Sequence, residues 1–563
     1  MRTTMIAVAV PPHFARAVAR VAAFALIAGF FVEAGCQRST ELELDIGAPT
    51  VDLLNPLSLP VSDFVLKNEL DAILAAVSIG ASRDSSNRLP LGALDPALNG
   101  DLTLDVMSGS QLVGLARIDN AEITPGQVLT LEADIRKPLV VVGAADAAEL
   151  AGSRHAPELL DPTTSTDLVE RGIKVPASQA SGFTTDGKTL FLAAADGLRA
   201  FDTGTGTASA PTPTPFVTAK MAIAPKNLGL ALVESASTNS RVIIYTDPSA
   251  LVASPTTAPS VSATIATGRP RTAHFSNTGD VLFVLVEPDG AEPCTGKSVP
   301  AANEIIPITR DGKLLAPIRL PSFVADFGVD RGGRLILSES GGNRISAMAL
   351  DASFASVGTP VKLYDAACPT AIRLLEDQLF VVTNDLSNVV SNAFSLMRGH
   401  VDGAVATRLA IARPTYQSQL NDSSTPDQLT SLNVQLVSTA VAASELVVSP
   451  DGNRAVFASR SRYLENKQAF TWANLACTAT ADIIEYGLHS VDLTAGTTSY
   501  ETRSQNVVVP PPKVPAATTD PCVLCKATFD TTFPPTTLTI PMLCVSVAGD
   551  RAAGLAASFA EQR

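Results

Sequence analysis

The chain has 563 residues, of which 46% are hydrophobic and 17% are charged, and this balance excludes a wholly disordered protein or a coiled coil. The net charge of −14 leaves no basic footprint for nucleic acid, so no nucleic-acid partner is expected. The 39 prolines and 36 glycines predict many short elements separated by turns.

The N-terminus carries the pattern of an export signal. Three arginines, Arg2, Arg16 and Arg20, precede an apolar run of 12 residues from Val21 to Val32. A run of this length suits the apolar part of a signal peptide and is too short to span a bilayer. We therefore expect residues 1–35 to be a signal peptide and the protein to be exported. The alternative is a buried helix of the fold.

The end of this segment, Val32-Glu33-Ala34-Gly35-Cys36, resembles the lipobox of bacterial lipoproteins. Ala34 and Gly35 fit the small pair that precedes the lipidated cysteine, whereas Glu33 departs from the apolar residue that the family carries there. The resemblance implies that Cys36 receives a lipid and anchors the protein to a membrane. The expected location is the outer membrane, facing the periplasm or the cell surface. Ordinary cleavage after Ala34 is the alternative.

The following residues predict a tether and then a small β-rich domain. Residues 36–62 are polar and interrupted by proline, which favours a tether. The segment from Asp63 to Val77 fits either one helix or a pair of strands. From Asp101 to Val106 polar and apolar residues alternate, and glycine turns follow at 108–110 and 125–126, which is typical of a small β-sandwich. We expect this domain over residues 63–137.

A hairpin pattern then recurs along the rest of the chain. Each copy has a short apolar arm, a turn that usually carries Asp or Asn with Gly, and a second apolar arm, which suits two buried strands joined by a tight turn. The first five copies start 40, 52, 54 and 45 residues apart, the spacing of propeller blades. The copies are 183–192, 223–232, 275–284, 329–337, 374–382, 448–457 and 547–556.

The run from Val448 to Phe457, Val-Ser-Pro-Asp-Gly-Asn-Arg-Ala-Val-Phe, resembles the blades of the YVTN/WD-like β-propellers of bacterial surface proteins. The resemblance implies an all-β fold, a propeller of about seven blades over residues 138–563 with a Cys-rich insertion around 459–540. The copy at 374–382 lacks Gly and the copy at 547–556 is rich in Ala, so six to eight blades fit the pattern. Residues 138–143 are predicted to close the ring as a borrowed strand. Unrelated hairpins in a large β-sandwich are the alternative.

Six cysteines follow Cys36, and in an exported chain they predict three disulfides whose pairing the sequence leaves open. A zinc site or a redox dithiol at Cys522 and Cys525 is the alternative, and no metal or other cofactor is expected. The six are Cys294, Cys368, Cys477, Cys522, Cys525 and Cys544.

Five polar residues occupy comparable positions just before or within the first arm of their repeats. In a propeller such positions lie near the central channel, so these side chains are candidates for a channel ligand site. The alternative is that they are solvated or hydrogen-bonded residues with no ligand. They are Arg271, His274, Asp326, Arg373 and Glu445.

These patterns favour a non-catalytic binding or scaffold protein of the cell envelope, attached to the membrane by an N-terminal lipid and open to a protein partner. The sequence holds no Gly-x-Ser-x-Gly elbow, P-loop or Rossmann fingerprint. Two alternatives stay open: a lactonase-like hydrolase with its site at the propeller channel, and a purely structural envelope protein.

Overall fold

In the computed structural model, the described residues are the strands between residues 40 and 143, residues 158–160, and most of the chain from 173 to 560. The longest gaps after residue 173 are 289–301, 385–393, 412–428, 437–442, 509–543 and 548–556. The predicted signal peptide and Cys36 lie outside the described residues. No helix of the described part is long and apolar enough to cross a membrane.

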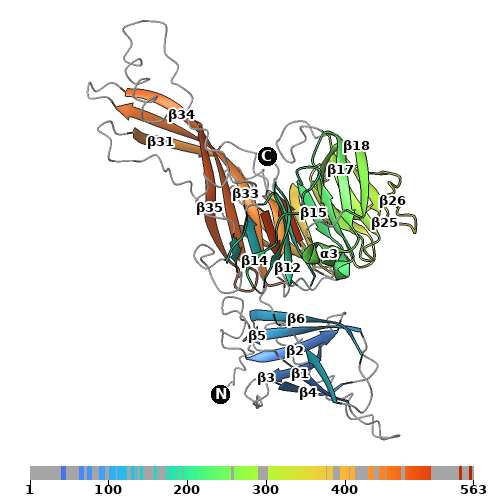
Figure 1. Cartoon of the computed structure of the whole chain (residues 1–563). Coiled ribbons are helices and arrows are strands. Elements are labelled where there is room, and N and C mark those ends of the chain that lie inside the picture. The colour runs from blue at the N-terminus through green and yellow to red at the C-terminus, as the bar shows by residue number, and fades with distance from the viewer. Residues whose placement is uncertain are drawn as a thin grey trace, which may run out of the picture.

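The N-terminal unit is built from two sheets whose strands are mostly antiparallel (Figure 1). One sheet has the strand order β4-β1-β7 and the other has the order β3-β2-β5-β6. Phe64 and Leu66 of β2 and Leu104 and Val106 of β5 are buried at alternate positions, as a sheet with one covered face requires. The strands are β1 (Thr40–Asp45), β2 (Asp63–Asn68), β3 (Ile73–Ser78), β4 (Arg88–Leu94), β5 (Gly100–Ser108), β6 (Gln111–Ala121) and β7 (Val128–Glu132).

The structure decides between two alternatives for this unit and corrects one expectation. The segment from Asp63 to Val77 is the strand pair β2–β3 and not a helix, because Phe64 and Leu66 are buried with a period of two. The segment 36–62 is not a plain tether, because it contains β1, which pairs with β4 and β7. The alternation Glu41-Leu42-Glu43-Leu44 is the sequence signal for this strand.

Six sheets follow, each containing four strands that pair in chain order, and we call them blades 1 to 6; the sixth carries one additional strand. The first three are blade 1 with β11 (Ala180–Phe183), β12 (Thr189–Ala194), β13 (Gly197–Asp202) and β14 (Thr207–Ala208); blade 2 with β15 (Lys220–Ile223), β16 (Leu230–Val233), β17 (Thr238–Tyr245) and β18 (Val261–Thr267); and blade 3 with β19 (Arg269–Phe275), β20 (Val281–Glu287), β21 (Glu304–Thr309) and β22 (Ile318–Arg319).

The same order of strands continues in the next three blades. They are blade 4 with β23 (Asp326–Val329), β24 (Leu335–Glu339), β25 (Arg344–Leu350) and β26 (Ser356–Asp365); blade 5 with β27 (Pro369–Leu375), β28 (Gln378–Asn384), β29 (Phe394–His400) and β30 (Ala406–Ile411); and blade 6 with β32 (Ala443–Val448), β33 (Arg454–Phe470), β34 (Ala476–Asp492) and β35 (Thr497–Val508).

The first two strands of each blade are the predicted hairpins. The first six copies of the repeat pair as antiparallel arms in blades 1 to 6. In the Asp-Gly copies the glycine adopts a left-handed conformation, with φ of 69° at Gly187 and 68° at Gly452, and its N–H closes the turn at 2.8 Å to Thr184 and Ser449 respectively. A side chain at these glycines would be strained, so the turn chemistry explains the repeat.

A five-stranded sheet closes the ring. Its order is β10-β9-β8-β36-β37, so strands that precede blade 1 and strands that follow blade 6 share one sheet. Val140 to Gly143 pair with β36, which confirms the predicted borrowed strand. The prediction of a hairpin within residues 547–556 is wrong. The two paired strands lie on either side of that range, because β36 ends at Val547 and β37 begins at Ala557. The strands are β8 (Val140–Gly143), β9 (Glu158–Leu160), β10 (Ile173–Lys174), β36 (Cys544–Val547) and β37 (Ala557–Ala560).

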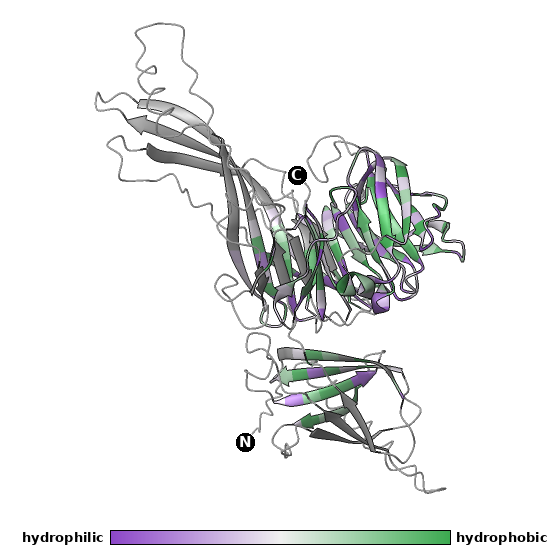
Figure 2. Cartoon of the chain, in the orientation of Figure 1, coloured by the Kyte–Doolittle hydropathy of each residue, from purple (hydrophilic) through white to green (hydrophobic). Residues whose placement is uncertain are grey.

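The first strands of successive blades pack against one another around the ring, and β37 lies against β11. Apolar clusters fill the space between neighbouring blades, and Figure 2 shows the apolar residues concentrated within the blades. Each blade therefore buries both of its faces against its neighbours, as a propeller requires. The protein is an all-β protein with a β-propeller preceded by a small β-rich unit.

Blade 6 is extended into an arm. Its second and third strands, β33 and β34, each have 17 residues, and β31 (Leu429–Leu436) pairs with the outer part of β33. Figure 1 shows this extension rising beyond the ring, on the side opposite the N-terminal unit. Much of the predicted Cys-rich insertion is therefore a continuation of the strands of blade 6.

Candidate functional site at the arm face

The register of the strands defines one face of the ring. Arg269 at the start of β19 pairs with Glu287 at the end of β20. In blade 6 Ala443 at the start of β32 pairs with Ser459, from which β33 continues outward into the arm. The inner strands therefore begin on the same side of the ring from which the arm rises, and we call this side the arm face.

Three inner strands carry a bulge just inside the arm face. In each, one residue is skipped in the pairing with the second strand. Such bulges bend a strand and redirect one side chain, and they are frequent beside functional sites. The skipped residues are Arg271 in β19, Thr370 in β27 and Glu445 in β32. Two predicted site residues, Arg271 and Glu445, thus occupy equivalent positions, and the side chain of Glu445 lies outside the described part.

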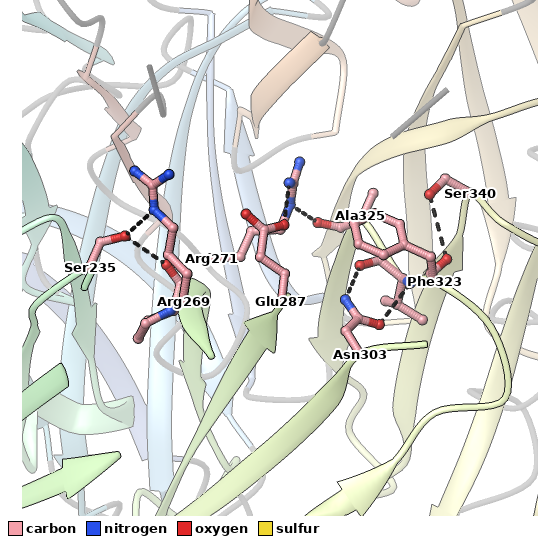
Figure 3. A network of polar contacts seen from close by, with 10 residues as sticks. Ser235, Arg269, Arg271, Glu287, Asn303, Phe323, Ala325 and Ser340 are labelled. Atoms are coloured by element: carbon pink, nitrogen blue, oxygen red, sulfur yellow. Dashed lines mark hydrogen bonds and ion pairs between the residues drawn. The ribbon is translucent and has the colours of Figure 1, made fainter. Parts of the chain in front are cut away.

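Arg271 joins two blades (Figure 3). Its Nη1 atom forms an ion pair with Glu287 Oε2 at 2.8 Å, and the two side chains are 15% and 5% exposed. Its Nε atom donates a hydrogen bond to the carbonyl oxygen of Ala325 at 2.6 Å, at the entry to blade 4. Because both partners are protein atoms, the position of the guanidinium group is fixed without a ligand.

Asp326 connects blade 4 to blade 5. Its Oδ1 accepts from the backbone N–H of Phe327 and its Oδ2 from that of Ile372, both at 2.9 Å. Burial raises the pKa of Asp326 to about 6, although the two N–H groups and the positive charges of Arg271 and Lys220 act in the opposite direction. The carboxyl group therefore changes its charge near neutral pH.

His274 is held neutral. Its Nε2 lies 3.4 Å from Thr272 Oγ1, and its ring packs edge-on against Phe327 with the ring centres 5.0 Å apart. Burial, followed by the positive charge of Arg373, lowers the pKa of His274 to about 3. At physiological pH the imidazole is therefore uncharged. In that form it can act as a hydrogen-bonding group or as a proton acceptor.

The structure brings four of the five predicted residues onto three neighbouring inner strands, β19, β23 and β27. Their charges act on one another, since Arg271 influences Asp326 and Arg373 influences His274. The contacts of Arg271 and Asp326 run between blades, which is the arrangement expected of hydrogen-bonded residues with no ligand. A ligand bound here stays a prediction. The residues so placed are Arg271, His274, Asp326 and Arg373.

The sequence interpretation missed several polar residues at the same face. Arg269 donates from Nε to Ser235 Oγ at 3.0 Å, and Asn303 spans the start of blade 4 by bonding both the N–H and the carbonyl oxygen of Val324 (Figure 3). The spacing Arg269-Pro270-Arg271 could have indicated that two cations share one strand end. Nothing in the sequence pattern points to Asn303 or Ser235, because their partners are distant in the chain.

Cysteines and metal ligands give little further definition of a site. Cys368 is disulfide-bonded, and the side chains of the other predicted disulfide cysteines lie outside the described part, so the pairing stays a prediction. Within the described ranges no group of three or more His, Cys, Asp or Glu side chains is arranged to hold a metal ion.

No family model and no curated protein matches the sequence. Among solved structures, hydrazine synthase from Kuenenia stuttgartiensis is 12% identical with a TM-score of 0.33, covering 50% of this chain and 75% of its own. The Cps50 (Swd1) β-propeller domain from Myceliophteria thermophila is 10% identical with a TM-score of 0.33 and coverages of 59% and 99%. Virginiamycin B lyase from Staphylococcus aureus is 14% identical with a TM-score of 0.29 and coverages of 53% and 84%. The assignment to the β-propeller class rests on the sheet order and packing described above.

Proposed function

We propose that the protein is an exported, lipid-anchored β-propeller that acts as a non-catalytic binding protein of the cell envelope. The arm of blade 6 is the observation that carries this proposal. We infer that a protein partner docks on the arm face, with the arm as the main point of attachment.

The arm is far longer than the blade needs. The second strands of blades 1 to 5 have four to seven residues, whereas β33 has 17. Ten extra residues of strand correspond to about 30 Å. A strand extension adds nothing to the packing between blades, so its natural use is contact with another molecule.

The arm also has the form of a binding platform. Its strand order is β31-β33-β34-β35, so β31 and β35 are the outer strands of this sheet. Outer strands offer backbone N–H and C=O groups to an extended peptide, which is a common way for a protein to recognise a partner.

The place of action rests on the sequence. The export signal at 1–35 and the lipid acceptor Cys36 favour a body tethered to the envelope, with the outer membrane facing the periplasm or cell surface as the proposed site. The net charge of −14 favours a soluble body that is held near the membrane by its lipid rather than by basic residues.

Cross-linking with mass spectrometry on intact cells tests this function. The key variant replaces residues 461–485 by Asn-Gly, since Arg460 and Tyr486 are cross-strand partners and a two-residue turn can join them. Val252→Ser, on helix α3 (Pro248–Ala253) at the end of β17 away from the arm face, is the control. We expect a partner that cross-links to the full chain and the control but not to the shortened arm. Equal cross-linking of all three would contradict the proposal.

A hydrolase with its site at the propeller channel is a second candidate, favoured by one observation. Asp326 has a pKa raised to about 6 and His274 a pKa lowered to about 3, and titratable groups with opposed shifts are common in active sites. Hydrolysis of a panel of lactones and esters by the full chain, abolished in both Asp326→Asn and His274→Gln, would favour it. Absence of turnover in the wild type would exclude it for that panel.

A further inference from the structure

Two arginines on β19 are anchored in the same manner. Arg269 donates from Nε to Ser235 Oγ at 3.0 Å, and Arg271 donates from Nε to the carbonyl oxygen of Ala325 at 2.6 Å. Figure 3 shows both guanidinium groups extending to the same side of β19, with their terminal nitrogens beyond these bonds. The Nε bonds therefore aim the two groups toward the arm face.

The anchors are themselves fixed. Ser235 Oγ also donates to the carbonyl oxygen of Pro270 at 3.2 Å, which ties blade 2 to β19. Residues two apart on a strand point to the same face, so Arg269 and Arg271 reach this side together although the pairing is interrupted at Arg271. A side chain held in this way loses little conformational entropy when it binds a ligand.

Several donors of the pair are unused. Arg271 gives its Nη1 to Glu287, whereas its Nη2 and both terminal nitrogens of Arg269 have no bonding partner among the described residues. Glu287 pairs with Arg271 and the carboxylate of Asp326 also acts on it, whereas Arg269 has no ion-pair partner among the described residues. The two arginines thus leave the charge of Arg269 unpaired and offer a set of aimed N–H donors.

We propose that Arg269 and Arg271 form a binding site for one oxyanion group, a carboxylate or a phosphate. One oxygen of the group would accept from the terminal nitrogens of Arg269 and another from Nη2 of Arg271, the paired geometry in which guanidinium groups recognise such anions. Glu287 keeps Arg271 in place from the other side. This inference goes beyond the docking of a protein on the arm and does not depend on it.

Calorimetric titration of the full chain with inorganic phosphate and, separately, with succinate tests the site. We expect binding of at least one anion, weakened at least about tenfold in Arg269→Gln, because a charge-assisted hydrogen bond is lost. The matched control is Arg241→Gln: Arg241 belongs to the same face, but Nε and Nη2 are both engaged by Glu234 at 2.8 and 2.9 Å, so its loss should leave binding unchanged.

Each outcome of the titrations either supports or overturns the anion site. Binding of phosphate alone or of succinate alone supports the site and shows which kind of oxyanion it takes. Binding of both supports a site that recognises the oxygen arrangement common to phosphate and carboxylate. Arg269→Lys keeps the positive charge but loses the paired terminal nitrogens of the guanidinium group, so it should bind the anion more weakly than wild type. It also supplies a second variant if Arg269→Gln fails to fold. Binding of neither anion by the wild type, or equal losses in the Arg269 and Arg241 variants, would overturn the proposal.

Discussion

The carboxylate of Asp326 accepts a hydrogen bond at 2.9 Å from the backbone N–H of Ile372, and so joins the inner strands of blades 4 and 5. Arg271 joins blades 3 and 4 in a comparable way through the carbonyl oxygen of Ala325. The inner strand of a blade pairs on one edge only, so its other edge carries backbone groups that need partners. Polar side chains at the strand starts supply these partners and hold the ring together.

The pKa of Asp326 predicts a pH-dependent contribution to stability. Because the folded-state pKa is about 6 and the ordinary value is 3.8, the contribution is complete below about pH 4 and is lost as the pH rises through about 6. The change amounts to at most about 3 kcal/mol. We expect the free energy of unfolding of the wild type, relative to Asp326→Asn, to fall over this range in urea titrations. A relative stability that rises with pH would contradict the assignment.

His274 predicts the opposite slope. Its folded-state pKa of about 3 is below the ordinary value of 6.5, so its contribution is present above pH 6.5 and is lost as the pH falls toward 3. The full change is at most about 5 kcal/mol. Between about pH 4 and 6 the two residues offset each other in the wild type. His274→Gln should therefore show a stability that falls with rising pH, and Asp326→Asn one that rises, in the same urea titrations.

The hairpins were predictable because their chemistry is local. A tight turn with Asp-Gly needs a left-handed glycine, and the sequence records this need directly at Gly187 and Gly452. The copy at 374–382 lacks glycine and still forms the β27–β28 hairpin, because the apolar arms alone suffice once blades 4 and 6 cover them.

The site was predictable only in part. Arg271, Asp326 and His274 were identified from their position in the repeat, which fixes where a residue lies on its strand. Their partners are set by packing between blades: Ile372 is 46 residues from Asp326, and Ser235 is 34 residues from Arg269. The insertion around 459–540 was predicted, but its form as an arm of continued strands was not, since nothing in the local sequence of β33 distinguishes a strand within the ring from one that continues beyond it.

Glu339 predicts a large and local loss of stability. It is fully buried, and it accepts from Arg344 Nη2 at 2.9 Å, from Ser322 Oγ at 2.5 Å and from Ser346. Burial alone would raise its pKa, but these three bonds outweigh burial and lower it. Glu339→Ala should cost about 3 kcal/mol in chemical denaturation, because three donors lose their acceptor.

The matched control for Glu339 lies in the same blade. Lys362 pairs with Asp365 at 2.6 Å, but the two side chains are 48% and 79% exposed. Lys362→Ala should change the free energy of unfolding by about 0.5 kcal/mol or less. Similar losses in the two variants would show that burial does not set the strength of these ion pairs.

Gly197 predicts a backbone-specific effect. Its φ is +134°, and a Cβ atom there would overlap the carbonyl oxygen of Thr212, which accepts from the N–H of Leu198 at 2.8 Å. Gly197→Ala should lower stability by about 2 kcal/mol or more, because it adds a clash to an unfavourable backbone conformation. Gly333→Ala is the control: its φ is +78° with nothing within 4 Å, so about 1 kcal/mol is expected. Thermal melts that rank the two variants the other way would refute this reading.

The closing sheet predicts that a change in β8 destabilises the whole ring. Val141 pairs with Ser546 on one side and with Leu159 on the other, so β8 is an interior strand of this sheet. A proline cannot donate to the ladder and is poorly tolerated inside a sheet, so Val141→Pro should cost about 3 kcal/mol, whereas Val141→Thr keeps the N–H and the branched shape.

Because β37 lies against β11 and β36 against β32, loss of this sheet uncovers blades 1 and 6 together. We therefore expect Val141→Pro, but not Val141→Thr, to lower the urea midpoint and to expose the chain to limited proteolysis in both blades. Equal midpoints for the two variants would mean that the ring does not depend on its closure through β8.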